Sequence, residues 1–253
     1  MMYTKDEIQA VKYYIGDVRN MPSDGFWNDP KAYCLLNALF FPGIATESAR
    51  IAEGKFLNPE ILSDIPRLKA FFRNLCSAFR KSEQEHLTYR VERYADFQQM
   101  YQQKQTISFT STSKNGFLSA YQDRIGIALL KFRIPENTPI IDMQSFFQNY
   151  AKPEEAEILL PPGRKLQFEV SPLSDAEKTI LDAENHPPLI SCTVTVQNQA
   201  DFPEIREFPD SGNLAGIRVI NALQNGSVPE NQDILNYSAW KSALSVEILH
   251  WFS

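Results

Sequence analysis

The sequence contains few cysteines and histidines, and they are scattered. Three of its 253 residues are cysteine, which leaves one thiol over in any disulfide scheme, and three are histidine. Cys34 and Cys76 lie among apolar residues typical of helix cores, which favours reduced structural thiols. His86, His186 and His250 are far apart and near no cysteine cluster, so neither a zinc spacing nor a Cys–His nucleophile pattern occurs. The sequence therefore predicts no metal site.

A long apolar run and an excess of positive charge are also missing. Nowhere do about 18 apolar residues follow one another, as a transmembrane helix requires, and the N-terminus has no apolar stretch resembling a secretory signal. We therefore expect no stable membrane insertion and synthesis in a cytoplasm. The formal net charge of −6 argues against a nucleic-acid partner, because duplex affinity depends on Lys and Arg neutralising phosphates. A small molecule and a protein are the expected partners.

The spacing of apolar residues divides the chain into three parts. Residues 1–85 have helical spacing, and Thr4 followed by Glu7 predicts a capping box at the first helix. Residues 86–200 contain short runs that alternate with period two, which is typical of strands. Helical spacing returns over residues 201–253. Helices, strands and helices again predict an α+β protein, in which the first two parts form a domain and the third a helical C-terminal extension.

Three segments of the β-rich part carry polar residues suited to chemistry. The first is the Tyr89-Arg90 pair, in which strand packing would hold Arg90 while its planar guanidinium faces phosphate oxygens. A surface ion pair is the alternative for this arginine, and Arg93 is its nearest rival. In the second segment, strand alternation places Ser111 and Ser113 on one side, where small hydroxyls admit a ligand closely. A Ser/Thr-rich edge strand is the alternative there.

The third segment contains two acids, Glu155 and Glu157. Because they are two residues apart, an extended backbone would direct both carboxylates to one face. Such proximity is repulsive unless a cation or a ligand compensates, which favours a functional pair. A solvated strand edge is the alternative.

In their order along the chain, these segments resemble the signature of the Arg-Ser-Glu class of mono-ADP-ribosyltransferases, of the bacterial effector and toxin type. The segments are Tyr89-Arg90, Phe109–Ser113 and Glu155–Gly163. The resemblance implies two roughly perpendicular antiparallel sheets that form an NAD cleft, with helices at both ends of the chain. It also implies that the domain spans residues 1–200, and that NAD is the co-substrate.

The resemblance further implies which residues surround the cofactor. Arg90 would support the dinucleotide and the cleft, and Phe117, after a turn, would stack on the flat nicotinamide ring. A place in the core is the alternative for Phe117. The expected cofactor-binding set is Tyr89, Arg90, Ser111, Thr112, Ser113 and Phe117.

For catalysis the resemblance implies Glu157, Glu155, Arg90 and Ser111. Ser111 would orient Glu157, whose carboxylate would stabilise the oxocarbenium-like carbon that forms as nicotinamide leaves. Glu155 would deprotonate the attacking nucleophile. In this family an acid at the first position of the pair is associated with arginine acceptors.

Residues 144–152 resemble the family's substrate-contacting loop, in which Phe147 or Tyr150 would contact the target, although their spacing departs from that of common members. The implied enzyme is a monomeric glycosyltransferase that moves ADP-ribose from NAD to a host-cell protein. By analogy it would be a virulence effector, secreted without a cleavable signal peptide and active in the host cytoplasm. An NAD glycohydrolase and a non-catalytic binding module of the same fold are the alternatives.

Overall fold

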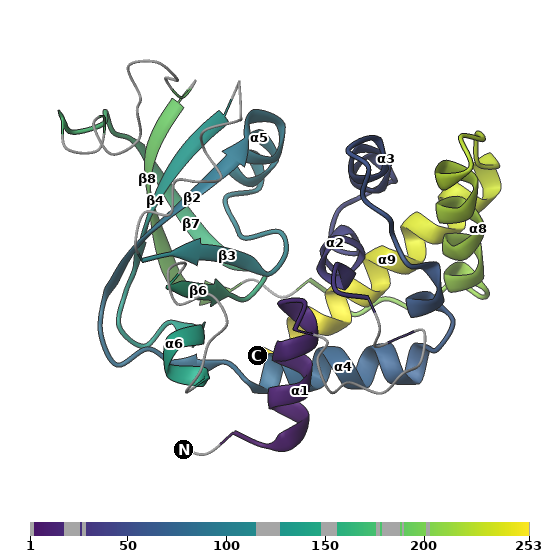
Figure 1. Cartoon of the computed structure of the whole chain (residues 1–253), viewed down its shortest axis with the longest axis horizontal. Coiled ribbons are helices and arrows are strands. Elements are labelled where there is room, and N and C mark those ends of the chain that lie inside the picture. Colours follow the sequence, from purple (N-terminus) through teal and green to yellow (C-terminus); the bar gives the residue numbers. More distant parts are fainter. Residues whose placement is uncertain are drawn as a thin grey trace. The chain divides into compact units, whose positions relative to one another are not determined.

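The computed structural model divides into two compact units (Figure 1). The helical unit combines Met1–Ala78 with Phe202–Ser253, and the β unit is Phe79–Asp201. The described residues are 3–17, 26, 29–114, 127–147, 156–175, 178, 188, 190–200 and 203–252.

The helical unit is built from both ends of the chain. Its helices are α1 (Lys5–Tyr14), α2 (Ala32–Ala38), α3 (Ala45–Ala52), the 3-10 helix η1 (Pro59–Leu62), α4 (Ile65–Ser77), α8 (Gly212–Gln224) and α9 (Asn231–His250). The capping box predicted at the first helix is confirmed. The Thr4 hydroxyl accepts a hydrogen bond from the Glu7 amide at 3.2 Å, and the Glu7 carboxylate accepts one from the Thr4 amide at 2.8 Å.

The last two helices pack within this unit, where α8 contacts α3 and η1, and α9 contacts α4. A buried ion pair adds to this packing: Lys241 Nζ on α9 lies 2.6 Å from Glu47 Oε1 on α3. The same ammonium group donates to the carbonyls of Ala38 at 3.2 Å and Gly43 at 2.6 Å. The segment predicted as a C-terminal extension thus contributes core contacts to the N-terminal helices.

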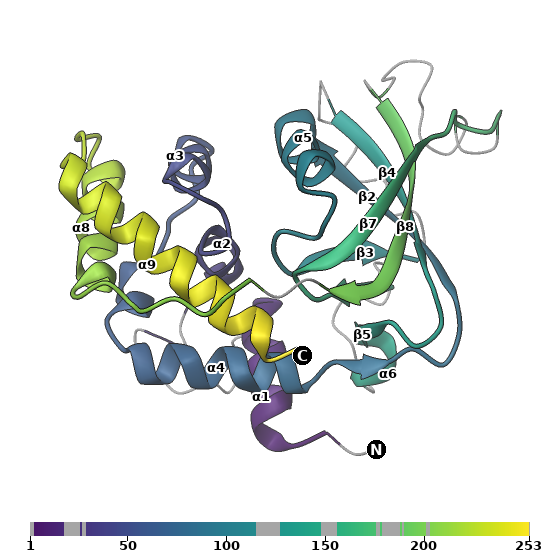
Figure 2. The ribbon, with the colours of Figure 1, turned by 180° about the vertical axis from the view of Figure 1, so that it is seen from behind.

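In its described residues the β unit has eight strands and two short helices. The strands are β1 (Arg80–Lys81), β2 (His86–Arg93), β3 (Thr110–Ser113), β4 (Ile127–Ile134), β5 (Pro139–Asp142), β6 (Glu157–Leu160), β7 (Arg164–Val170) and β8 (Ile190–Ala200), and the helices are α5 (Tyr94–Gln103) and α6 (Met143–Phe146). The strand order is β1-β5-β6-β3-β2-β4-β8-β7. Figure 2 shows β7 beside β8 at one edge. The predicted α+β class is confirmed.

The sheet changes direction between β3 and β2. A single residue pair, Tyr89 with Ser113, joins these strands, whereas β2 pairs with β4 along its whole length. We call β1, β5, β6 and β3 the first strand group and β2, β4, β8 and β7 the second; β3 and β6 run across the direction of β2 and β4 (Figure 1). The two predicted sheets thus correspond to two groups of one strand order. The resemblance implied antiparallel sheets, and within the second group one pair, β4 with β8, is parallel.

Both strand groups contribute to one apolar core. Ile158 and Leu160 of the first group and Phe132 of the second are fully buried in one cluster with Phe97 and Met100 of α5. Since side chains alternate along a strand, the residues next to Ile158, among them Glu157, lie on the opposite face of the first group. The core therefore fixes which face of β6 carries the carboxylate.

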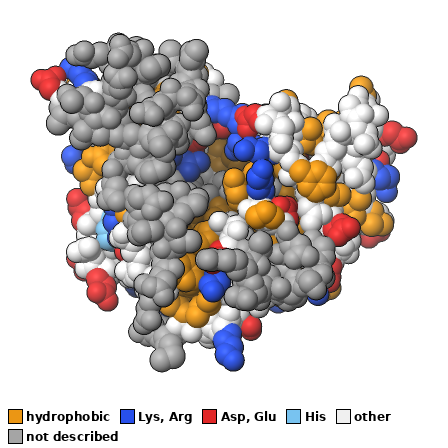
Figure 3. Space-filling view, viewed as in Figure 1, with side chains coloured by type: hydrophobic (Ala, Val, Ile, Leu, Met, Phe, Trp, Pro, Cys, Tyr) orange, Lys and Arg blue, Asp and Glu red, His pale blue; other side chains and the backbone are white. Residues whose placement is uncertain are grey.

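On the face drawn in Figure 3, acidic and basic side chains alternate with apolar ones over the described surface. The net charge of −6 thus has no single focus on this face. None of the helices in the described ranges combines the length and the hydropathy that crossing a membrane requires.

Candidate active site

The three sequence motifs meet on neighbouring strands of the β unit. Strand β3 lies between β2 and β6, and Ser113 on β3 pairs with Tyr89 on one side and with Glu157 on the other. Residues directly opposite each other in antiparallel strands have Cβ atoms about 4.5–5.5 Å apart on the same face. Tyr89, Ser113 and Glu157 therefore form one row across the sheet.

Ser111 lies on the same face as Ser113 but one step further along the strand. Its partner on β6 is Leu159, so it is diagonal to Glu157. The hydroxyl directly across from the Glu157 carboxylate belongs to Ser113. The expected role of Ser111 in orienting Glu157 remains a prediction. In the register, Ser113 and not Ser111 is directly opposite Glu157.

Thr112 is directed to the other face. Its side chain is buried, and its hydroxyl donates a hydrogen bond to the Ile158 carbonyl at 3.0 Å. The structure therefore does not bring the Thr112 hydroxyl to the face that carries Glu157. In this position Thr112 strengthens the pairing of β3 with β6.

Arg90 connects the two strand groups at their junction. Its Nη1 donates a hydrogen bond to the Ser111 carbonyl at 2.7 Å, and its Nε forms an ion pair with Oε1 of Glu92. The side chain of Arg90 is 28% exposed and that of Glu92 only 10%. A charge-assisted contact of this kind is stronger than a neutral hydrogen bond. The guanidinium is thus fixed beside the Ser111–Ser113 segment and still reaches solvent.

Glu157 begins β6 directly after an unusual backbone conformation. Ala156 has φ +42°, in the left-handed region that costs a residue with a side chain about 1–2 kcal/mol. The Lys114 amide donates a hydrogen bond to the Ala156 carbonyl at 3.1 Å and holds this turn. The backbone is therefore not extended at Ala156, contrary to the assumption that placed both acids on one face. Strained residues of this kind cluster at functional sites.

Three predicted site residues, Phe117, Tyr150 and Glu155, lie outside the described residues. Phe147 is described and directly follows α6, where its ring packs against that of Phe146 at 4.7 Å between centroids. Helix α6 contacts β6, so Phe147 follows a helix that packs against the strand of Glu157.

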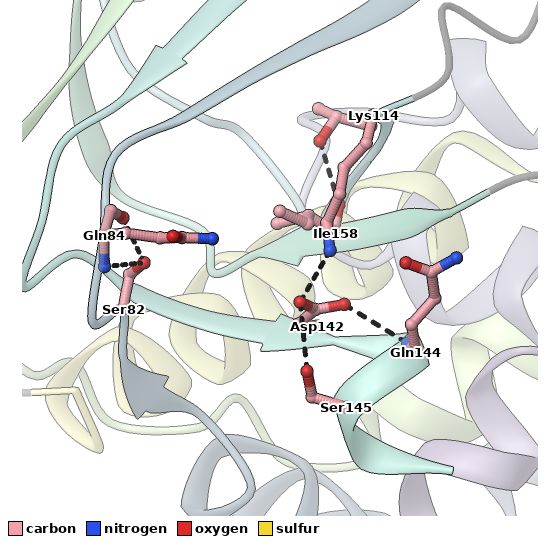
Figure 4. Close-up of polar contacts among 8 residues, drawn as sticks. Ser82, Gln84, Lys114, Asp142, Gln144, Ser145 and Ile158 are labelled. Carbon is pink, nitrogen blue, oxygen red and sulfur yellow. Dashed lines mark hydrogen bonds and ion pairs between the residues drawn. The ribbon is translucent and has the colours of Figure 1, made fainter. Parts of the chain in front are cut away.

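Sequence reasoning missed a polar cluster beside these motifs. Lys114 Nζ lies 2.7 Å from Asp142 Oδ2 at the end of β5 (Figure 4). His86 is close to both: burial lowers the pKa of its imidazole, the Lys114 charge lowers this pKa further, and the Asp142 carboxylate opposes the shift. One signal was available in the sequence, because Lys114 directly follows Ser113.

Glu92 was also missed, although its spacing contained a signal. Two residues apart on a strand, Glu92 and Arg90 share a face, and opposite charges there attract. Among the described residues, no group of three or more His, Cys, Asp or Glu side chains is placed to hold a metal ion.

No protein-family model matches the chain, and no curated protein matches it. Solved structures similar to it include Plx2a, an ADP-ribosyltransferase toxin of Paenibacillus larvae, with a TM-score of 0.46 and 13% identity over 77% of this chain and 87% of that chain. C3stau2 of S. aureus with NAD has a TM-score of 0.46 and 16% identity over 78% and 89% of the two chains. C3larvin toxin, an ADP-ribosyltransferase of Paenibacillus larvae, has a TM-score of 0.41 and 15% identity over 77% and 96%. At such low values the similarity assigns no function by itself.

Proposed function

We propose that the protein is an NAD-dependent mono-ADP-ribosyltransferase. The observation that carries this proposal is the register of β2, β3 and β6, in which Ser113 lies between Tyr89 and Glu157. Arg90 is bonded to the carbonyl of Ser111 beside them. Segments that carry arginine, serine and glutamate thus lie on adjacent strands, in the order that the motif resemblance implies. Because side chains alternate along a strand, Arg90 leaves β2 on the opposite face from Tyr89, and its contact with the Ser111 carbonyl is what links it to β3.

The chemistry follows from a carboxylate held near a glycosidic bond. In NAD the bond between the ribose C1′ and the nicotinamide nitrogen breaks, and the departing nicotinamide takes the bonding electrons. The ribosyl carbon then carries positive charge, which the Glu157 carboxylate stabilises. The acceptor nitrogen donates its lone pair to C1′, and its proton passes to Glu155.

The residues of this chain fit NAD as the co-substrate. The Arg90 guanidinium suits the diphosphate, because its planar fork matches phosphate oxygens. The Ser111 and Ser113 hydroxyls, on the face of Glu157, suit the nicotinamide ribose. Tyr89, Thr112 and Phe117 complete the proposed cofactor set. Thr112 contributes indirectly, because its hydrogen bond to Ile158 holds β3, which carries Ser111 and Ser113, beside β6.

We place the acceptor beside Phe147 and Tyr150, and we take it to be an arginine of a host-cell protein because Glu155 stands at the first position of the acidic pair. In this proposal the protein is a monomeric secreted effector. It reaches its target in the host cytoplasm.

The proposal predicts different effects for the two acids. Glu155→Gln should lower transfer to agmatine, a small guanidino compound, more than it lowers NAD hydrolysis, because water needs less activation than a guanidinium. Rates of both reactions with the purified variant measure this difference. Equal losses in the two assays would refute the separate roles proposed for Glu155 and Glu157.

Incubation with labelled NAD and a host-cell lysate tests the transfer itself. The wild type should label a discrete protein band, and Glu157→Gln should not. Glu169→Gln, the same substitution at an exposed position of edge strand β7, should label the band normally. Nicotinamide release without a band would favour a glycohydrolase, and absence of both products would favour a binding module.

A further inference from the structure

Lys114 contacts residues next to both β6, the strand of Glu157, and α6, the helix that precedes Phe147. Its backbone amide bonds to the Ala156 carbonyl at 3.1 Å, one residue before Glu157. Its side-chain ammonium lies 2.7 Å from Asp142 Oδ2. The Lys114 and Asp142 side chains are 25% and 16% exposed, respectively. Lys114 thus contacts Asp142, directly before α6 and Phe147, and Ala156, directly before Glu157.

Asp142 in turn fixes the start of that segment. Its Oδ1 accepts a hydrogen bond from the Gln144 amide at 3.2 Å, which caps α6, and its Oδ2 accepts one from the Ser145 hydroxyl at 3.2 Å (Figure 4). A side-chain cap of this kind satisfies a backbone donor that the helix itself leaves unpaired. Phe147 follows at the end of the same short helix. The position of α6, and of Phe147 at its end, therefore depends on Asp142.

The ion pair lies on the opposite face of the sheet from the proposed reaction. Asp142 pairs with Ile158, and Ile158 is buried in the apolar core, whereas the Glu157 side chain lies on the other face. Neither Lys114 nor Asp142 is on the face where NAD would react. Their effect on chemistry must therefore act through the backbone and through α6.

We propose that Lys114 and Asp142 are positioning residues, which hold α6, and with it Phe147 at its end, against β6 and so favour transfer of ADP-ribose to a protein over hydrolysis of NAD. The inference rests on the function proposed above. Nicotinamide release needs only NAD and Glu157, so it does not depend on this segment. Transfer also needs the acceptor at the correct place, and small misplacements of reacting groups cost large factors in rate.

The neighbouring imidazole of His86 reports on the pair without any enzyme assay. Lys114 lowers the pKa of His86, and Asp142 raises it. Lys114→Met should therefore raise the pKa of His86, and Asp142→Asn should lower it. An NMR titration of His86 in each folded variant shows whether both charges lie beside the imidazole.

The decisive experiment compares two reactions in Lys114→Met and Asp142→Asn. We expect kcat/KM for transfer to agmatine and to labelled lysate proteins to fall about tenfold, while NAD hydrolysis without acceptor stays within about twofold of the wild-type rate. Lys114→Arg, which keeps the charge and can still reach Asp142, should recover most of the transfer. Lys81→Met, at an exposed position of β1, is the matched control and should change neither rate.

Equal losses of transfer and hydrolysis would show a merely structural role and overturn the inference, as would unchanged transfer. If the wild type releases no nicotinamide, the proposed function fails, and amide hydrogen exchange then decides the positioning role. Exchange over residues 143–147 should become faster in both variants. Unchanged exchange would overturn the inference independently of catalysis.

Discussion

Arg90 holds β2 and β3 together at the point where their backbone pairing ends. In the described part of the chain one residue pair joins the strands, and the contact of Arg90 Nη1 with the Ser111 carbonyl extends the link. One partner of the guanidinium is Glu92, whose side chain is almost buried. A buried carboxylate is held in place more firmly than an exposed one, so Glu92 determines where Arg90 points.

From this geometry we predict that Glu92→Gln raises the KM for NAD about tenfold, which corresponds to about 1.4 kcal/mol, with a smaller effect on kcat. The reason is that Arg90 loses its charged partner and presents its guanidinium to the NAD phosphates less often. Steady-state nicotinamide release at varied NAD concentration measures both parameters. A lower kcat with an unchanged KM would contradict this role for Glu92.

Some residue-level features followed from the sequence, and others depended on contacts between distant segments. The order of Arg90, Ser111 and Glu157 was readable, because each motif is local. The pairing of Ser113 rather than Ser111 with Glu157 was not, because register depends on how two strands separated by a long connection meet. The left-handed backbone at Ala156 was also not predictable, because an alanine in the sequence does not indicate a positive φ.

Among the elements, those with local signals were predicted best. The capping box of Thr4 and Glu7 marked the start of α1, and period-two alternation marked β2. Helix α5 was not predicted, although Tyr94, Phe97 and Tyr101 recur at helical spacing, because residues 94–103 lie between two predicted strands in the part of the chain taken as β-rich. The parallel pairing of β4 with β8 could not be predicted, since strand polarity follows from the connection and not from the strands themselves.

Over the whole molecule, the two ends of the chain depend on each other inside the helical unit. Lys241 on α9 and Glu47 on α3 have side chains 1% and 0% exposed. Burial lowers the pKa of Lys241, and Glu47 opposes this shift. Two such groups are tolerated in a core only as a pair, because an unpaired buried charge is costly. Residues 1–200 without α9 would leave Glu47 without this partner, so we expect that fragment not to fold stably.

We therefore predict that Lys241→Met lowers the free energy of unfolding by about 3–5 kcal/mol, the cost of removing one partner of a buried pair. The double variant Lys241→Met with Glu47→Leu should recover most of this loss, since no charge then remains buried. Urea unfolding followed by circular dichroism measures both. Lys178→Met, which removes an exposed ion pair with Asp175, is the control and should change stability little. A double variant as unstable as the single one would contradict the account.

The central claim about the whole molecule is that Glu157 drives cleavage of the nicotinamide bond of NAD. The most direct test is the rate of nicotinamide release by the purified wild type and by Glu157→Gln, together with the affinity of each for NAD. We predict a loss of at least about a hundredfold in kcat, in the range found when a charge-stabilising group is removed, with NAD affinity nearly unchanged. Release by Glu157→Gln at the wild-type rate would contradict the claim.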